Sequence, residues 1–201
     1  MRLPRSSGIL LHPTSLPGPH GSGDLGAAAR HFIDWLAVGE QRLWQVLPLG
    51  GIGPGNSPYM SDSAFAGNPL LIDLADLHRQ GWLDGAALVP SPDLSEQAVN
   101  FAAMMAFRMR ALALAAAGFD AGAGETDRAD FAVFCQEQSA WLDDYALFMA
   151  LQAQHPDQAW NQWPQPLAER EPLALAQARL ALAGDCLFWQ FCQWVFFRQW
   201  R

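Results

Sequence analysis

The chain has 201 residues, of which 51% are hydrophobic and 16% are charged, and its formal net charge at pH 7 is −8. This composition predicts a folded protein with a sizeable core and is unlike that of disordered chains. The 12 lysine and arginine positions are all arginine, and because the acidic excess repels phosphate backbones, nucleic acid is not an expected partner.

The cysteine spacing and the N-terminal sequence indicate in which cellular compartment the protein is expected. Cys135, Cys186 and Cys192 lack CxxC spacing, which predicts reduced core thiols rather than a disulfide framework or a zinc site. The apolar run at residues 8–11 is shorter than the roughly 7–15 residues of a secretory signal, and no apolar stretch of about 20 residues stands out. We therefore expect a cytoplasmic protein with no membrane partner.

The first 49 residues predict a strand, a helix and a second strand. Residues 8–11 form a short apolar run that is closed by His12 and Pro13, as in a buried parallel strand. Apolar residues then recur at helical spacing over residues 25–36, and residues 43–49 read as another strand. A strand, helix and strand in about forty residues is a βαβ unit, which favours a parallel sheet or barrel.

Residues 50–69 form a long loop without periodicity, and loops of this length are often functional. Tyr59 follows Pro58 shortly after a predicted strand end, where barrel enzymes place their sites. Its ring could stack on a sugar, or it could pack into its own loop. His12 also lies at a strand end, where a lone histidine is more often structural.

The rest of the chain is predicted to be helical. Helices are expected over residues 98–117 and 131–149, with a Gly/Ala/Asp linker at residues 118–124 between them. Pro172 is suited to begin a last helix, which continues to the final residues. That helix ends in mid-pattern on residues 197–201 without a glycine cap, which suggests that the chain is truncated. In such an incomplete fold we expect the apolar faces of Phe188, Phe191 and Phe196 to be exposed.

Six stretches of the sequence resemble the 4-α-glucanotransferase family, the amylomaltases or disproportionating enzymes. The most specific is GNSPYMSDSAFAGNPLLIDL at residues 55–74. The others are GILLHPTSLPGPHGSGDLG, RLWQVLPLG, WLDDYALFMAL, WNQWP and FFRQW, and the resemblance is weak only over residues 88–124.

The resemblance implies an α/β fold that forms the start of a (β/α)8 TIM barrel, with about two strands and a mostly helical inserted subdomain. Residues 1–83 would hold the strands, first helix and substrate-side loop, residues 84–171 the helical insertion, and residues 172–201 a long helix toward a third strand. The family transfers α-1,4-glucan segments to a 4-hydroxyl through a covalent glucosyl-enzyme, without a cofactor or metal. Its catalytic carboxylates would lie beyond Arg201, so the chain alone should be inactive.

The resemblance also assigns candidate site residues. Tyr59 matches the family tyrosine that stacks on the sugar, and Ser57 lies beside it; Asn68 and Pro69 match a loop-shaping turn, and His12 is grouped with them. Residues 51–54 lack an aromatic that some members carry, which places an auxiliary glucan site there in doubt.

The acidic residues offer no obvious catalytic pair. Retaining glycosidases need two carboxyl groups about 5 Å apart, whereas the acidic pairs of this chain suit solvated faces or caps; these pairs are Asp73 with Asp76, Asp143 with Asp144, and Glu169 with Glu171. Two other functions stay open, a noncatalytic glucan-binding protein and a helical interaction module derived from the same fold.

Overall fold

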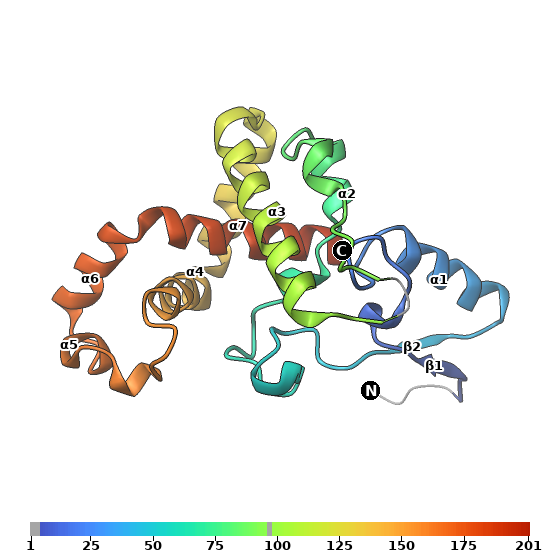
Figure 1. Ribbon diagram of the computed structural model, residues 1–201, viewed down its shortest axis with the longest axis horizontal. Helices are drawn as coiled ribbons and strands as arrows, with labels where there is room; N and C mark the ends of the chain where they lie inside the picture. The colour runs from blue at the N-terminus through green and yellow to red at the C-terminus, as the bar shows by residue number, and fades with distance from the viewer. Residues whose placement is uncertain (1–4, 96–97) are drawn as a thin grey trace. The chain divides into compact units, whose positions relative to one another are not determined.

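The computed structural model describes residues 5–95 and 98–201, and these form two compact units (Figure 1). Unit 1 comprises the described residues up to Ala123 together with Val195–Arg201, and unit 2 comprises Gly124–Trp194. The predicted domain boundaries after residues 83 and 171 remain predictions. They separate barrel segments from an inserted subdomain, whereas the two units are defined by how compactly their residues pack.

A parallel pair of strands joined by a helix begins unit 1, as the sequence predicts. Strand β1 (Gly8–Leu10) pairs with β2 (Leu43–Gln45), with Ile9 opposite Trp44, and α1 (Ala27–Val38) lies between them in sequence. The ring of Phe32 on α1 meets the ring of Trp44 edge-on at 4.9 Å, so the helix packs on the strand pair. The strands are shorter than predicted, and Pro48, which has no backbone N–H, follows soon after β2.

Short helical segments and one long helix complete the first part of unit 1. In chain order these are η1 (Pro13–Ser15), η2 (Pro54–Asn56), η3 (Pro69–Leu71), α2 (Leu74–Arg79), η4 (Gly85–Leu88) and α3 (Phe101–Gly122). The inward face of α3 buries Met104, Phe107, Leu112 and Phe119. Burial of this apolar face contributes most of the helix's stability in its place.

The predicted linker at residues 118–124 is wrong, because α3 continues through Gly118 to Gly122. A β-carbon at Gly118 would collide with the carbonyl oxygen of Trp82. The glycine therefore permits close packing of α3 on the segment after α2, and the true break is confined to Ala123 and Gly124.

Helix α3 is long and apolar on average, although Arg108 and Arg110 interrupt its apolar sequence. Within the described chain, it is the helix whose length and mean hydropathy would allow it to cross a membrane. Its inward face instead packs within unit 1 and carries Arg108, whose side chain is fully buried. Helices α6 and α7 would pass the same test only as a pair, and they are bent by 82°.

Unit 2 is built from helices, namely α4 (Glu125–Gln154), η5 (Trp160–Gln162), α5 (Gln165–Ala168), α6 (Pro172–Ala181) and most of α7 (Ala183–Trp200). Its core groups Leu147, Leu151 and Trp163 with half-buried neighbours from α5 and α6. Pro172 begins α6 as predicted, but the expected single last helix is interrupted at Leu182.

The expectation that residues 188–196 expose an apolar face is also wrong. The side chains of Phe191 and Phe196 are 2% and 3% exposed, and Phe188 is half-buried. All three cysteines are free, but only Cys192 is fully buried. Burial raises the pKa of Cys135 to about 11 and raises that of Cys192 further, so both thiols stay protonated near neutral pH.

Candidate functional site

The loop after β2 forms one wall of a groove in unit 1 with a volume of about 530 Å³. Residues 48–50, which follow β2, form a second side of the groove, and aromatic residues near the end of α7 complete the lining. The lining residues are Pro48, Leu49, Gly50, Pro58, Tyr59, Ser61, Ser63, Ala64, Phe65, Ala66, Gly67, Phe196, Phe197 and Trp200. This volume lies within the range of small-ligand sites, about 300–1,000 Å³.

A tight turn presents Tyr59 at the edge of this groove. The backbone N–H of Gly53 donates to the carbonyl oxygen of Ser57 at 3.1 Å, and Gly55 between them has φ +72°. The Ser57 hydroxyl oxygen accepts from the Tyr59 N–H at 3.3 Å. The turn thus holds the backbone while the Tyr59 side chain remains 70% exposed.

The second half of the loop is held by its own serines and by Asn68. Ser63 Oγ accepts from the N–H groups of Phe65 and Ala66. The Asn68 N–H donates to Leu49 O at 2.8 Å, and its Oδ1 accepts from Leu70 N at 3.0 Å. Asn68 is therefore the N-cap of η3, with Pro69 as first residue, and this cap anchors the end of the loop to the side of the groove formed by residues 48–50.

Of the five candidate residues, Tyr59 lines the groove, whereas Ser57, Asn68 and Pro69 lie in or next to the same loop without lining it. His12 belongs to a different segment, the turn after β1. It occupies the N-cap of η1, and burial lowers the pKa of its imidazole. Its Nδ1 is buried and has no hydrogen-bond partner among the described residues. The histidine is thus placed beside β1 rather than among the residues that line the groove.

The acidic pairs of unit 2 are engaged in exposed contacts. Asp144 pairs with Arg170 at 2.6 Å and with Arg179 at 2.7 Å, and Asp143 accepts from Gln190. Glu169 accepts from Gln165. Exposed ion pairs of this kind stabilise a fold by about 0–1 kcal/mol.

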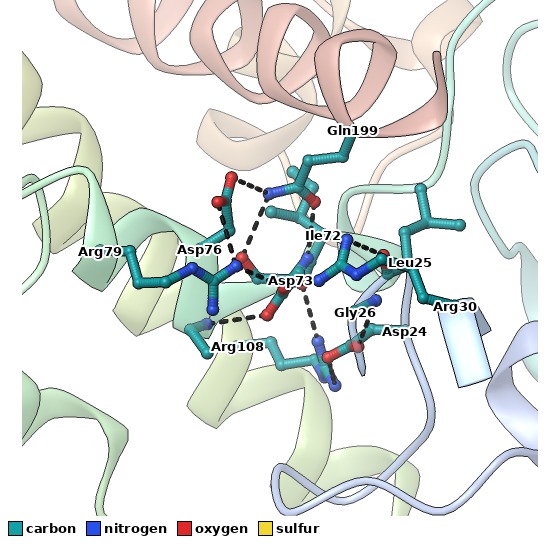
Figure 2. A network of polar contacts seen from close by, with 11 residues as sticks. Asp24, Leu25, Gly26, Arg30, Ile72, Asp73, Asp76, Arg79, Arg108 and Gln199 are labelled. Atoms are coloured by element: carbon teal, nitrogen blue, oxygen red, sulfur yellow. Dashed lines mark hydrogen bonds and ion pairs between the residues drawn. The ribbon is translucent and has the colours of Figure 1, made fainter. Parts of the chain in front are cut away.

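Asp73 and Asp76 belong to a larger network that the sequence did not reveal (Figure 2). Asp73 caps α2 through Ala75 N, and its Oδ2 lies 3.2 Å from a guanidinium nitrogen of Arg30 and of Arg79. The Gln199 amide accepts from Asp73 N at 2.7 Å and donates to Asp76 at 3.1 Å. A residue 126 positions away thus completes the cap.

Arg108 forms the buried half of this network. Its guanidinium donates to the carbonyl oxygens of His20, Ser22 and Ile72 at 2.9–3.2 Å. It also lies 3.0 Å from Asp24 Oδ2. Burial raises the pKa of Asp24, although Arg108 acts in the opposite direction. The arginine therefore fixes the Gly/Pro-rich loop before α1 against η3.

Asp24 and Asp73 come close to each other, which raises the question of a catalytic pair. A β-carbon at Gly26 would lie 2.6 Å from Asp24 Oδ1 and 3.0 Å from Asp73 Cγ. However, Asp24 accepts from Gly26 N and Arg108, and Asp73 accepts from Ala75 N and two arginines. Each of the four oxygens has a donor, and neither residue lines the groove, so this pair holds the fold together.

The comparisons with known proteins identify the class to which this groove and fold belong. A family described as 4-alpha-glucanotransferase matches residues 11–201, so the chain belongs to that family. The resemblance drawn from the sequence is thereby confirmed.

Individual relatives agree with this assignment. The chain is 48% identical over 200 residues to a 4-alpha-glucanotransferase of Thermus thermophilus, covering 100% of this chain and 39% of the relative. It is 46% identical over 197 residues to that of a Synechocystis strain, covering 98% and 39%. The amylomaltase from Streptococcus agalactiae in complex with acarbose superposes with a TM-score of 0.88 at 33% identity, covering 98% and 40%. The chain spans about 39% of the length of the curated relatives it matches.

Proposed function

We propose that this chain is part of a 4-α-glucanotransferase that transfers α-1,4-glucan segments to the 4-hydroxyl of an acceptor sugar. The observation that carries the proposal is family membership over residues 11–201, together with a groove that presents Tyr59. The parallel strands β1 and β2 with α1 are consistent with the start of a (β/α)8 barrel. Maltooligosaccharides are the proposed ligands, no cofactor is needed, and the proposed location is cytoplasmic.

Within this proposal Tyr59 supplies a sugar-stacking surface. Its ring is exposed, its backbone is fixed by the Gly53–Ser57 turn, and an aromatic face suits the apolar C–H face of a pyranose. Ser57 uses its oxygen to accept from Tyr59 N and retains its hydroxyl hydrogen for a sugar oxygen. Asn68 and Pro69 set the end of the loop, and His12 occupies the N-cap of η1 just after β1.

The chemistry itself is assigned to carboxylates outside this chain. Glucosyl transfer with retention requires a nucleophile and an acid/base about 5 Å apart. The close pair Asp24 and Asp73 has its oxygens occupied by arginine and backbone donors. The isolated chain is therefore expected to contact sugar but not to cleave it.

A transfer assay on maltotriose tests this function. Glucose release is measured for the 201-residue chain and for a chimera in which it replaces the matching segment of the Thermus thermophilus relative. The expected result is activity for the chimera and none for the chain alone. Glucose release by the purified chain would contradict the assignment of the chemistry. An inactive but folded chimera that still binds maltotriose would favour the noncatalytic glucan-binding alternative, and one that binds none would favour the interaction module.

A further inference from the structure

The loop that carries Tyr59 ends against the last turns of α7, and Gly67 and Phe196 make this contact. Both residues are buried, both belong to unit 1, and both line the groove. A β-carbon at Gly67 would collide with three carbons of the Phe196 ring, namely Cγ, Cδ1 and Cε1. The loop backbone therefore lies directly on the aromatic ring, and no room is left for a side chain between them.

This close approach is the reason why position 67 needs a glycine. The glycines with positive φ in the described part of the chain are Gly21, Gly55 and Gly81, so the backbone conformation at Gly67 does not itself exclude other residues. An alanine could adopt this conformation, but its methyl group would force the loop and the ring apart. Because Phe196 is only 3% exposed, its ring has little space into which it can move.

The end of α7 that carries Phe196 is fixed by a second contact with unit 1. Gln199, about one helical turn further on, accepts from Asp73 N at 2.7 Å and donates to Asp73 O at 3.2 Å (Figure 2). It also donates to Asp76 Oδ2 at 3.1 Å. Since the helix end is tied down next to the ring, the loop is the part that must yield when the contact is crowded.

The segment between Tyr59 and Gly67 is stiffened by its own serines. Ser63 Oγ accepts from the backbone N–H groups of the two residues before Gly67, at 3.1 and 3.2 Å. Ser61 Oγ donates to Ser63 O at 2.9 Å. Such side-chain bonds to neighbouring backbone groups fix one turn after another. A displacement at Gly67 is therefore passed on to Tyr59 instead of being absorbed in between.

We propose that Gly67 and Phe196 are positioning residues for glucan transfer, because their contact sets where the ring of Tyr59 meets the sugar. The proposal rests on the proposed function, in which Tyr59 stacks on a glucosyl unit. A small misplacement of a group that positions the substrate lowers the rate, since the substrate is no longer held in its reactive geometry. Both residues act through Tyr59 rather than by contacting the sugar.

Kinetics of the transferase chimera on maltotriose test the proposal. Gly67→Ala inserts a methyl group at the contact. Gly51→Ala is the matched control in the same loop, because its β-carbon would lie 3.9 Å from the nearest atom, Ser61 Oγ. The expected result is a roughly two- to fivefold lower kcat/KM for Gly67→Ala, mainly through a higher KM, and no change for Gly51→Ala. Phe196→Leu withdraws the ring from the loop and should also lower kcat/KM, which keeps the proposal testable if Gly67→Ala does not fold. Thermal midpoints establish that each variant is folded.

Combining these changes with Tyr59→Ala separates positioning from a general defect of the fold. Once the ring of Tyr59 is absent, nothing is left to position, so Gly67→Ala should cause no further loss of kcat/KM in the Tyr59→Ala background. An equal loss in both backgrounds would overturn the proposal. Wild-type kcat/KM in folded Gly67→Ala and Phe196→Leu would overturn it as well.

Failure of the proposed function would give a different pattern. A folded wild-type chimera without transfer activity would overturn the proposed function, and the positioning role would fall with it. An active chimera in which Tyr59→Ala keeps the wild-type kcat/KM would remove Tyr59 from the site and overturn the positioning role, while transfer by the chimera would stand. Impaired Tyr59→Ala with unimpaired Gly67→Ala and Phe196→Leu would overturn the positioning role alone.

Discussion

Two regions of unit 1 are rich in polar or aromatic side chains, but they differ in whether those side chains contact other protein groups or the solvent. Around Arg108 and Asp73, the largely buried oxygens of Asp24 and Asp73 all accept from arginine or backbone N–H groups. In the loop after β2, hydrogen bonds hold the backbone, while Tyr59 and Phe65 stay 70% and 66% exposed. A group whose partners are all internal supports the fold, whereas a fixed but exposed ring is available to a ligand.

Electrostatics explains why the first region cannot double as the second. A buried charge is tolerated only when it is paired and hydrogen-bonded. Opening Asp24 or Asp73 to a substrate would leave Arg108 or the α2 cap without a partner. The exposed loop has no such constraint, because its aromatic side chains give up little when a sugar replaces water.

The largest effect on stability is expected from Arg108→Met. The change leaves Asp24 and the carbonyl oxygens of His20, Ser22 and Ile72 without their buried donor. Breaking a buried pair from one side costs about 3–5 kcal/mol. Urea unfolding measures this loss of stability, with Arg79→Met as control, since the Arg79 side chain is 55% exposed whereas that of Arg108 is fully buried. Equal losses of unfolding free energy in the two variants would show that the buried arginine stabilises the fold no more than the exposed one.

A smaller loss is expected from Gly118→Ala on the helix that carries Arg108. Alanine normally favours a helix over glycine by about 1 kcal/mol. Here its β-carbon would meet the carbonyl oxygen of Trp82, so the variant should be destabilised by about 1–3 kcal/mol. Gly122→Ala, in the same helix with no atom within 4 Å, should be neutral or stabilising. The thermal midpoints of the two variants are compared with that of the wild type. A higher midpoint for Gly118→Ala would show that α3 is not packed against Trp82 as described.

A pH effect of still smaller size is expected from His20 beside Arg108. Burial, and then Arg108, lower the pKa of this imidazole from its ordinary 6.5, whereas Asp24 raises it. The folded state therefore favours neutral His20, and its contribution is present above pH 6.5 and lost as the pH falls through the lowered pKa. Between pH 7.5 and 5.5 the thermal midpoint should fall less in His20→Gln than in wild type. His12, whose pKa is also lowered by burial, accounts for part of what remains. A steeper fall of the thermal midpoint in His20→Gln than in wild type would contradict a lowered pKa of His20 in the folded state.

Local patterns were sufficient to predict the strand pair, α1 and the long loop after β2. The βαβ unit depends on periodicity within some forty residues, and the turn at Tyr59 depends on adjacent glycine and proline. The loop's grouping with Trp200 could not be predicted, because that groove joins residues about 140 positions apart in sequence.

Long-range packing also explains the errors. Gly118 looks like a linker residue until Trp82 is placed against it. Arg108 offered one usable signal, since it lies midway between Met104 and Leu112 at four-residue spacing, which places it on the buried face of α3. Its partners, 36 to 88 residues away, were beyond any local pattern.

We propose that the exposed loop serves the ligand, whereas the buried network around Arg108 serves the fold. The most direct measurement compares kcat/KM on maltotriose with the thermal midpoint for Tyr59→Ala and Tyr59→Phe in the transferase chimera. We expect stability within about 0.5 kcal/mol of wild type for both, because the side chain is exposed. We also expect roughly a fivefold or greater loss of kcat/KM for Ala, with most activity kept by Phe, because stacking needs the ring. Equal kcat/KM in wild type and Tyr59→Ala, or a loss explained by a lower midpoint, would contradict the claim.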